Sequence, residues 1–121
     1  MKISVVIANY NNGKYIDQCI NSLKSQTYRD IEIIFFDDNS TDNSLEIIQK
    51  YSDVKIIKNK KQTNYGSINQ LNAFKNAINL SSGALIFFLD SDDYFHEKKV
   101  ETVVNYFKND IFKKISFDLP I

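Results

Sequence analysis

The feature that most constrains the fold is a repeated change in the period of the apolar residues. Short runs rich in β-branched residues alternate with stretches in which apolar residues recur every third or fourth position. Such runs are typical of strands buried on both faces, and such stretches are typical of amphipathic helices. Because alternating strands and helices build βαβ units, we expect an α/β, Rossmann-like fold, with helices on both faces of a parallel sheet. The third, second, first and fourth strands should lie side by side in that order.

Four strands and four helices are expected within one domain that spans residues 1–121. Ser40 or Thr41 is the expected N-cap of the second helix, and Gly83 is the expected stop of the third. The expected strands are residues 3–8, 31–36, 54–57 and 84–89. The apolar stripes of the expected helices are Ile16 to Leu23, then Leu45 and Ile48, then Ile68, Leu71, Phe74 and Ile78, and finally Val100 to Phe107.

Polar side chains follow three of the expected strands. Asn9 follows the first, Asp37 and Asp38 follow the second, and residues 90–93 (Asp-Ser-Asp-Asp) follow the fourth. Ligands of open α/β sheets bind beyond the carboxyl ends of the strands, so these ends should share one crevice. Clustered carboxylates repel one another unless a cation neutralises them, and Mg²⁺ or Mn²⁺ takes such oxygen ligands. The spacing therefore predicts a metal–diphosphate site, at which the cation would stabilise a departing diphosphate.

A structural explanation of these acidic segments must be weighed as well. Asp suits turns and helix N-caps, so acidic turns often follow strands without any function. Taken alone, residues 37–40 are better explained as a turn, and residues 90–93 are explained equally well either way. Two acidic segments at one predicted edge favour a functional site.

Charge and cysteine content narrow the classes of protein. Lys plus Arg equals Asp plus Glu at 15 each, so nothing electrostatic points to nucleic acid as a partner. The single cysteine, Cys19, excludes an internal disulfide, favours a reducing compartment and is expected in the core. The N-terminal apolar run is too short for a signal peptide, and no run reaches the roughly 18 residues of a membrane span. We therefore expect a cytoplasmic domain. Membrane association of a full-length protein and a homodimer stay open.

Residues 4–44 and 83–93 resemble the inverting, GT-A-fold glycosyltransferases of family 2. The likeness depends on three features in order: a strand that ends in Asn-Tyr-Asn, one that ends in Asp-Asp-Asn-Ser-Thr-Asp, and one that ends in Asp-Ser-Asp-Asp. Each feature alone would be a weak signal, and the likeness extends from residue 2 to about residue 100. It implies transfer of sugar from a nucleoside-diphosphate sugar, a UDP-sugar first of all, to a hydroxyl of a carbohydrate or lipid-linked acceptor.

The resemblance also implies roles for individual residues. Asp38 would accept a hydrogen bond from the nucleotide base. Asp90 and Asp92 would form the DxD motif, with Asp92 bound to the Mn²⁺ or Mg²⁺ ion and Asp90 near the ribose or the metal. The residues implied to contact the base and ribose, partly through backbone atoms, are Ala8, Asn9 and Tyr10.

The middle and the end of the sequence depart from the family pattern. Many members follow an Asn-x-Gly loop, here residues 64–66, with a helical Arg that approaches the diphosphate. No Arg follows in this chain, and Lys75 could supply that charge, although an ordinary solvated lysine explains it slightly better. Nothing after Asp93, including Asp110 and Asp118, resembles the family's catalytic base. We therefore expect no catalytic residue in this sequence, which should bind the sugar donor without transferring the sugar alone. The base should lie in a C-terminal half outside it.

Three rival classes are weighed against this interpretation. A receiver-type signalling domain needs an acid pair after the first strand, where Asn9 to Asn11 stand, and a lone Asp after the third, where Lys58 and Asn59 stand. A dinucleotide-dependent dehydrogenase needs a G-x-G-x-x-G motif after the first strand, and none is present. A non-catalytic nucleotide-binding module stays open.

Overall fold

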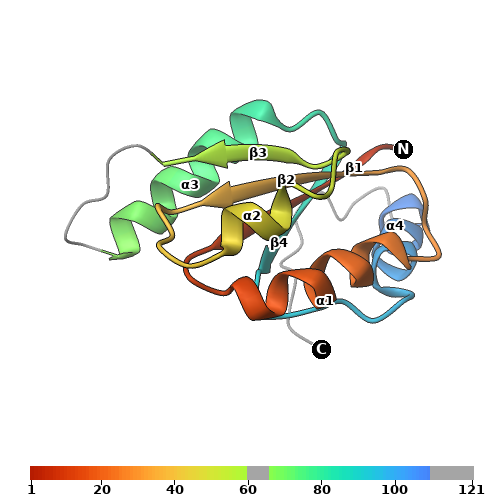
Figure 1. Cartoon of the computed structure of the whole chain (residues 1–121). Helices are drawn as coiled ribbons and strands as arrows, with labels where there is room; N and C mark the ends of the chain where they lie inside the picture. The colour runs from red at the N-terminus through yellow and green to blue at the C-terminus, as the bar shows by residue number, and fades with distance from the viewer. Residues whose placement is uncertain (60–65, 110–121) are drawn as a thin grey trace.

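The computed structural model describes the backbone of residues 1–59 and 66–109, and it contains the expected alternation of strands and helices. A four-stranded sheet has the order β3-β2-β1-β4, and each strand is parallel to its neighbours. Fold class and strand order are therefore confirmed (Figure 1). The elements in chain order are β1 (Ile3–Asn9), α1 (Gly13–Lys24), β2 (Ile31–Asp37), α2 (Ser44–Ile48), β3 (Lys55–Lys58), α3 (Gly66–Leu80), β4 (Leu85–Asp90) and α4 (Lys99–Asn109).

The helices cover both faces of the sheet, as the sequence predicts. Apolar residues of α1, α2 and α4 pack with one face of β1, β2 and β4 in the main core, which includes the buried Cys19. The opposite face carries a smaller cluster, in which Val6 and Ile34 pack against Ala77 of α3. In Figure 1, α3 lies behind the sheet while α1 and α2 lie in front of it. None of the helices described combines the length and the apolar character that a membrane span requires.

The predicted apolar stripe of α3 is only partly correct. Phe74 is half-buried, and its ring packs at a tilt against that of Phe88 of β4, with 4.7 Å between the ring centroids, while Ala77 is fully buried. Leu71 and Ile78 are instead 66% and 44% exposed. The small Ala77 side chain lets the helix approach the sheet along the line of residues 74 and 77, so the two larger residues lie on its shoulders. The side chain of Ile68 lies outside the described residues.

Two predicted helix ends are wrong. The N-cap of α2 is Asn43. The Ser40 hydroxyl donates to Asp37 instead, and the Thr41 amide donates to Asn11 in the loop after β1. Helix α3 ends at Leu80, and Gly83 does not have the positive φ of a helix-terminating glycine. Gly83 is needed for another reason, since a Cβ there would lie 2.5 Å from the backbone nitrogen of Ser4.

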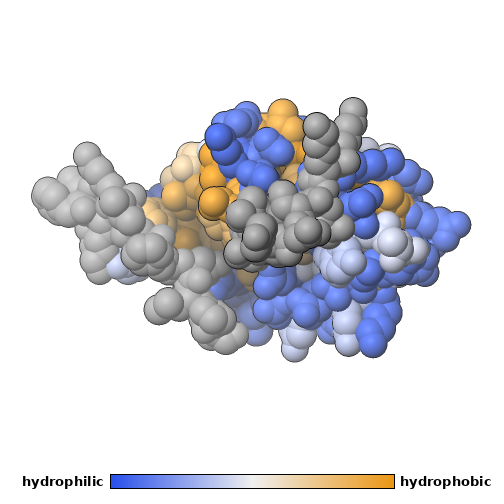
Figure 2. Space-filling model, turned by 90° about the vertical axis from the view of Figure 1, so that its left-hand side faces the viewer, coloured by the Kyte–Doolittle hydropathy of each residue, from blue (hydrophilic) through white to orange (hydrophobic). Residues whose placement is uncertain are grey.

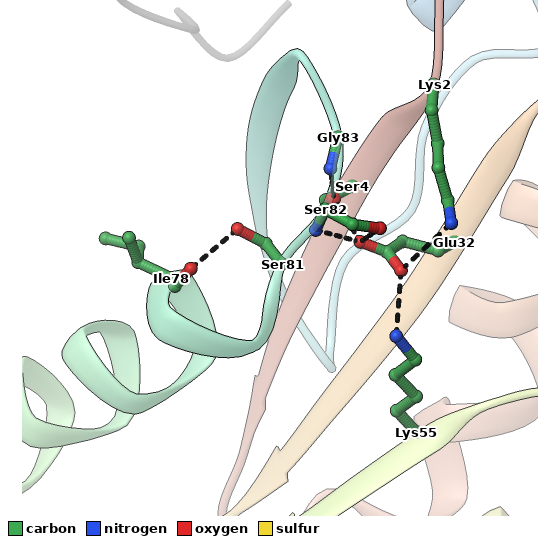
Figure 3. Close-up of polar contacts among 8 residues, drawn as sticks. All are labelled: Lys2, Ser4, Glu32, Lys55, Ile78, Ser81, Ser82 and Gly83. Atoms are coloured by element: carbon green, nitrogen blue, oxygen red, sulfur yellow. Dashed lines mark hydrogen bonds and ion pairs between the residues drawn. The ribbon is translucent and has the colours of Figure 1, made fainter.

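A polar cluster ties the amino ends of the strands together (Figure 3). The side chain of Glu32, on β2, is only 9% exposed. Its carboxylate accepts hydrogen bonds from Ser4 Oγ at 2.5 Å and from the Ser82 backbone at 2.6 Å. Lys55 Nζ lies 3.1 Å away and Lys2 Nζ 3.6 Å away. This one carboxylate therefore links β1, β2, β3 and the loop that leads into β4, at the end of the sheet opposite the acidic segments.

Candidate functional site

The carboxyl ends of β1, β2 and β4 meet at one edge of the sheet. Asn9 pairs with Asp37 on one side of β1, and Ala8 pairs with Asp90 on the other. Beyond these pairs, the Asp38 amide donates to the Asn9 carbonyl at 2.9 Å, and the Ser91 amide donates to the Ala8 carbonyl at 3.1 Å. Both acidic segments therefore begin within one residue of the end of β1. Figure 2 faces the edge toward which the β2 and β3 arrows of Figure 1 point, and hydrophilic residues dominate the lower right of its described surface.

A buried hydrogen-bond network joins the two segments through Asn9, which is 2% exposed. Asn9 Nδ2 donates to Asp37 Oδ1 at 2.8 Å and to Ser40 Oγ at 3.2 Å. Ser91 Oγ donates to Asn9 Oδ1 at 2.7 Å and accepts from Asn12 Nδ2 at 3.1 Å. The side chain of Asn9, expected at the nucleotide, is thus used inside the protein, which leaves any ligand contact of Asn9 to its backbone.

The two acids of the first segment have different environments. Asp37 is 1% exposed, and its carboxylate accepts from the backbone and hydroxyl of Ser40 at 2.9 and 2.6 Å. Asp37 therefore stabilises the turn that follows β2, as the structural explanation expects. Asn39 lies in this turn with a left-handed φ of 61°. Asp38 is half-buried, and its carboxylate accepts from Asn59 Nδ2, beyond β3, at 2.9 Å.

The second segment alternates between buried and exposed residues. Ser91 is fully buried, whereas Asp90, Asp92 and Asp93 are exposed. Loss of hydration raises the pKa of Asp90, and the nearby charges of Asp92 and Asp93 raise it further. A cation would relieve this mutual repulsion. Among the described residues, no group of three His, Cys, Asp or Glu side chains could hold a metal ion. One or two carboxylates that share an ion with phosphate oxygens would fit Mg²⁺ or Mn²⁺, so the residues suit a cation held jointly with a ligand.

A groove of about 380 Å³ opens between the end of β4 and α4. Leu89 and Val103 supply apolar walls, and Asp90, Asp93 and Tyr94 line its polar side. The groove gives the second acidic segment access to solvent and to a ligand on that side.

The N-terminus of α1 is closed by a side chain of the protein itself. The Gly13 amide donates to Asp42 Oδ2 at 2.9 Å, and Asp42 Oδ1 accepts from the Ser44 amide at 2.9 Å. Burial acts to raise the pKa of Asp42, but the hydrogen bonds from Ser44 and Gly13 lower it overall. In dinucleotide-binding Rossmann domains, this helix terminus receives the pyrophosphate. Its occupation by Asp42 argues against the dehydrogenase alternative.

The remaining candidate residues differ in their exposure. Tyr10 is 50% exposed beyond β1, and Ala8 is half-buried. Lys75 is exposed on α3. Its predicted approach to a diphosphate stays a prediction. Residues 64 and 65 of the Asn-x-Gly loop, and the tail with Asp110 and Asp118, lie outside the described residues.

Sequence reasoning gave no role of their own to Ser91, Asn59 and Asp42 at this edge. Ser91 lies between Asp90 and Asp92, the two acids of the expected DxD motif, and only its burial shows that its side chain faces inward. Asn59 follows β3, and the rule that polar residues gather beyond parallel strands could have found it. Asp42 gives no such signal, because its contact with Gly13 spans 29 positions of the chain.

Comparisons with known proteins identify the family of this chain. The model of the family "Glycosyl transferase family 2" matches residues 4–112. UDP-Glc:alpha-D-GlcNAc-diphosphoundecaprenol beta-1,3-glucosyltransferase WfaP of Escherichia coli is 37% identical over 108 residues, which are 89% of this chain and 42% of that enzyme. The curated relatives that the chain matches are thus more than twice as long as the matched part.

Solved structures show the same fold. Staphylococcus aureus TarS in complex with UDP-GlcNAc has a TM-score of 0.76 and 29% identity, over 90% of this chain and 32% of TarS. Pyrobaculum calidifontis mannosyltransferase PcManGT, in complex with GDP-Man and Mn²⁺, has a TM-score of 0.75 over 88% of this chain and 32% of its own, and at 16% identity it shows the fold alone. Receiver domains differ, because their sheet has the order 2-1-3-4-5. The chain belongs to glycosyltransferase family 2 and has the GT-A fold.

Proposed function

We propose that this chain binds the nucleoside diphosphate of a UDP-sugar at the carboxyl edge of its sheet, as part of a protein that transfers the sugar to an acceptor hydroxyl with inversion. The observation that carries the proposal is the approach of Asp38 and the segment 90–92 to the end of β1 from opposite sides. Relatives support the choice of nucleotide, since the E. coli enzyme is named for UDP-Glc and TarS is solved with UDP-GlcNAc.

Base recognition is assigned to the β1–β2 side of the edge. The carboxylate of Asp38 is half-exposed and is held by Asn59, so it can accept the imide N–H of uracil from a fixed position. Tyr10 presents an exposed ring on which a base could stack. The Ala8 and Asn9 carbonyls already accept the Ser91 and Asp38 amides. Of the three residues implied to contact the nucleotide, Tyr10 is therefore the most exposed.

The diphosphate is assigned to the second acidic segment. Asp92, with Asp90 beside it, would hold Mn²⁺ or Mg²⁺ jointly with phosphate oxygens. Burial raises the pKa of Asp90, and the charges of Asp92 and Asp93, which a cation would offset, raise it further. The bound cation offsets the negative charge that develops on the departing diphosphate. Lys75 stays a further candidate for phosphate contact.

Acceptor binding and the catalytic base are assigned to sequence beyond the described residues. Residues 1–121 would then form the part that binds the sugar donor. The acceptor would be a carbohydrate or a lipid-linked glycan, and the name of the E. coli relative, which includes diphosphoundecaprenol, supports the second.

Calorimetric titration with UDP, in Mn²⁺ and in EDTA, tests the proposal. We expect Mn²⁺ to strengthen UDP binding and Asp92→Asn to abolish that gain. Asp38→Ala should weaken UDP binding about tenfold in both conditions, because one hydrogen bond to a charged group is lost. Asp30→Asn is the matched control, since Asp30 is exposed at the opposite end of β2 and should leave UDP affinity unchanged. UDP affinity that ignores both Mn²⁺ and Asp92 would refute the metal assignment, and no UDP binding at all would refute the function.

A further inference from the structure

The side chain of Asn9 is a bridge between the two segments assigned to base and diphosphate. Its Nδ2 faces the β2 loop, through Asp37 at 2.8 Å, and its Oδ1 faces the β4 loop, through Ser91 at 2.7 Å. These contacts join residues 28 and 82 positions apart in the chain. All three side chains are at most 2% exposed, so water does not compete for their hydrogen bonds.

The chemistry of its neighbours fixes the orientation of this carboxamide. A flipped amide would place Oδ1 against the carboxylate of Asp37, and two acceptors would then face each other. Nδ2 must therefore face Asp37, and Oδ1 is left to accept the Ser91 hydroxyl. Asn12 Nδ2 donates to the same hydroxyl oxygen, while the hydroxyl proton of Ser91 goes to Asn9.

The Ser91 hydroxyl makes a side-chain link to β1 in addition to the backbone pairing of the sheet. The Ser91 backbone is already joined to β1 by its amide, which donates to the Ala8 carbonyl at 3.1 Å. The strand pairing of β4 with β1 involves residues 85–90 and does not use this hydroxyl. The hydroxyl instead fixes the turn that presents Asp90 and Asp92, immediately before and after it.

We propose that Asn9 and Ser91 are positioning residues that hold the acids of the segment 90–92 at a set distance from Asp38. The two ends of one nucleoside diphosphate can then be bound at the same time. This inference rests on the proposed function. Neither side chain touches the ligand: Asn9 and Ser91 act through the loops that they join, and the hydroxyl of Ser91 matters most for the diphosphate end.

The test compares uridine with UDP on wild type and Ser91→Ala, in Mn²⁺ and in EDTA. In the variant, we expect the gain in UDP affinity from Mn²⁺ to fall about tenfold, while uridine affinity stays within about twofold, since one hydrogen bond that orients only the diphosphate end is lost. A merely structural role would weaken both ligands in parallel. Asn12→Ala is the matched control, because it removes a bond to the same hydroxyl but leaves the link to Asn9. It should change neither quantity by more than about twofold.

The outcomes separate this inference from the function on which it rests. If wild type does not bind UDP, the positioning role and the proposed function are both refuted. If wild type binds UDP with a gain from Mn²⁺ and Ser91→Ala keeps that gain, or loses uridine affinity equally, only the positioning role falls. Should Ser91→Ala fail to fold, Ser91→Cys takes its place, because a thiol is only a weak hydrogen-bond donor. It should show the same selective loss of the gain from Mn²⁺, and a gain equal to that of wild type would overturn the positioning role.

Discussion

Replacing Glu32 with glutamine should destabilise the protein at neutral pH by about 2 kcal/mol. Burial acts to raise the pKa of Glu32, but hydrogen bonds from Ser4, Ser82 and Lys55 lower it from 4.5 to about 2. At about 1.4 kcal/mol per pH unit, this difference bounds the contribution of the charged carboxylate at about 3 kcal/mol. The ammonium groups of Lys2 and Lys55 are about half-exposed, at 46% and 55%, so solvent screens them and the lower figure is the better expectation.

The dependence of this contribution on pH has a definite sign. The folded protein holds Glu32 charged at a lower pH than the unfolded chain does, so the unfolded chain binds more protons between about pH 4.5 and pH 2. The stabilisation is therefore complete above about pH 5 and is lost as the pH falls toward 2. By pH 3, roughly half of it should be gone.

Urea unfolding of wild type and Glu32→Gln, followed by far-ultraviolet circular dichroism between pH 7 and pH 3, measures the effect. The difference in unfolding free energy should be largest at pH 7 and should shrink by roughly half at pH 3. Glu46→Gln, at an exposed position of α2, is the control and should match wild type throughout. A Glu32→Gln deficit that stays constant with pH would show that shape, and not charge, makes the carboxylate stabilising.

Three further predictions concern close packing. Gly83→Ala should cost about 3 kcal/mol in urea unfolding, because the new Cβ meets Ser4 backbone at 2.5 Å and backbone cannot yield. Gly13→Ala should cost less, about 1 kcal/mol, since its nearest obstacle at 2.3 Å is the tip of the Asn43 side chain, and equal losses would contradict this reasoning. Burial, and then the charges of the acids at 90–93, raise the pKa of Cys19 to about 12, so a thiol reagent at pH 8 should label it only after unfolding. Rapid labelling of the native protein would contradict the burial.

The pattern of apolar residues predicted β1 and β2 well because their burial on both faces leaves a long, unbroken signal. Its errors lie at the ends, where β1, β2 and β4 each continue one residue further, to Asn9, Asp37 and Asp90. Backbone pairing does not require an apolar side chain, so a strand runs on into polar sequence while its neighbour offers a partner. The buried side of helix α3 was harder to predict. Whether Leu71 faces the sheet depends on the small size of Ala77, six positions further along the helix.

The acidic edge could be located from the sequence, but the sequence does not show which carboxylates bond to the protein's own loops. Asp37 and Asp42 each accept backbone amides two or three residues ahead, so the adjoining loop consumes the carboxylate. Asp90 and Asp92 point out of a segment whose inward position is taken by Ser91. An acid that caps its own turn adds stability and has little left for a ligand, while exposed acids one residue apart repel each other until something binds. That difference in local bonding, and not the number of aspartates, is why we propose the segment 90–92 as the place for a cation and a diphosphate.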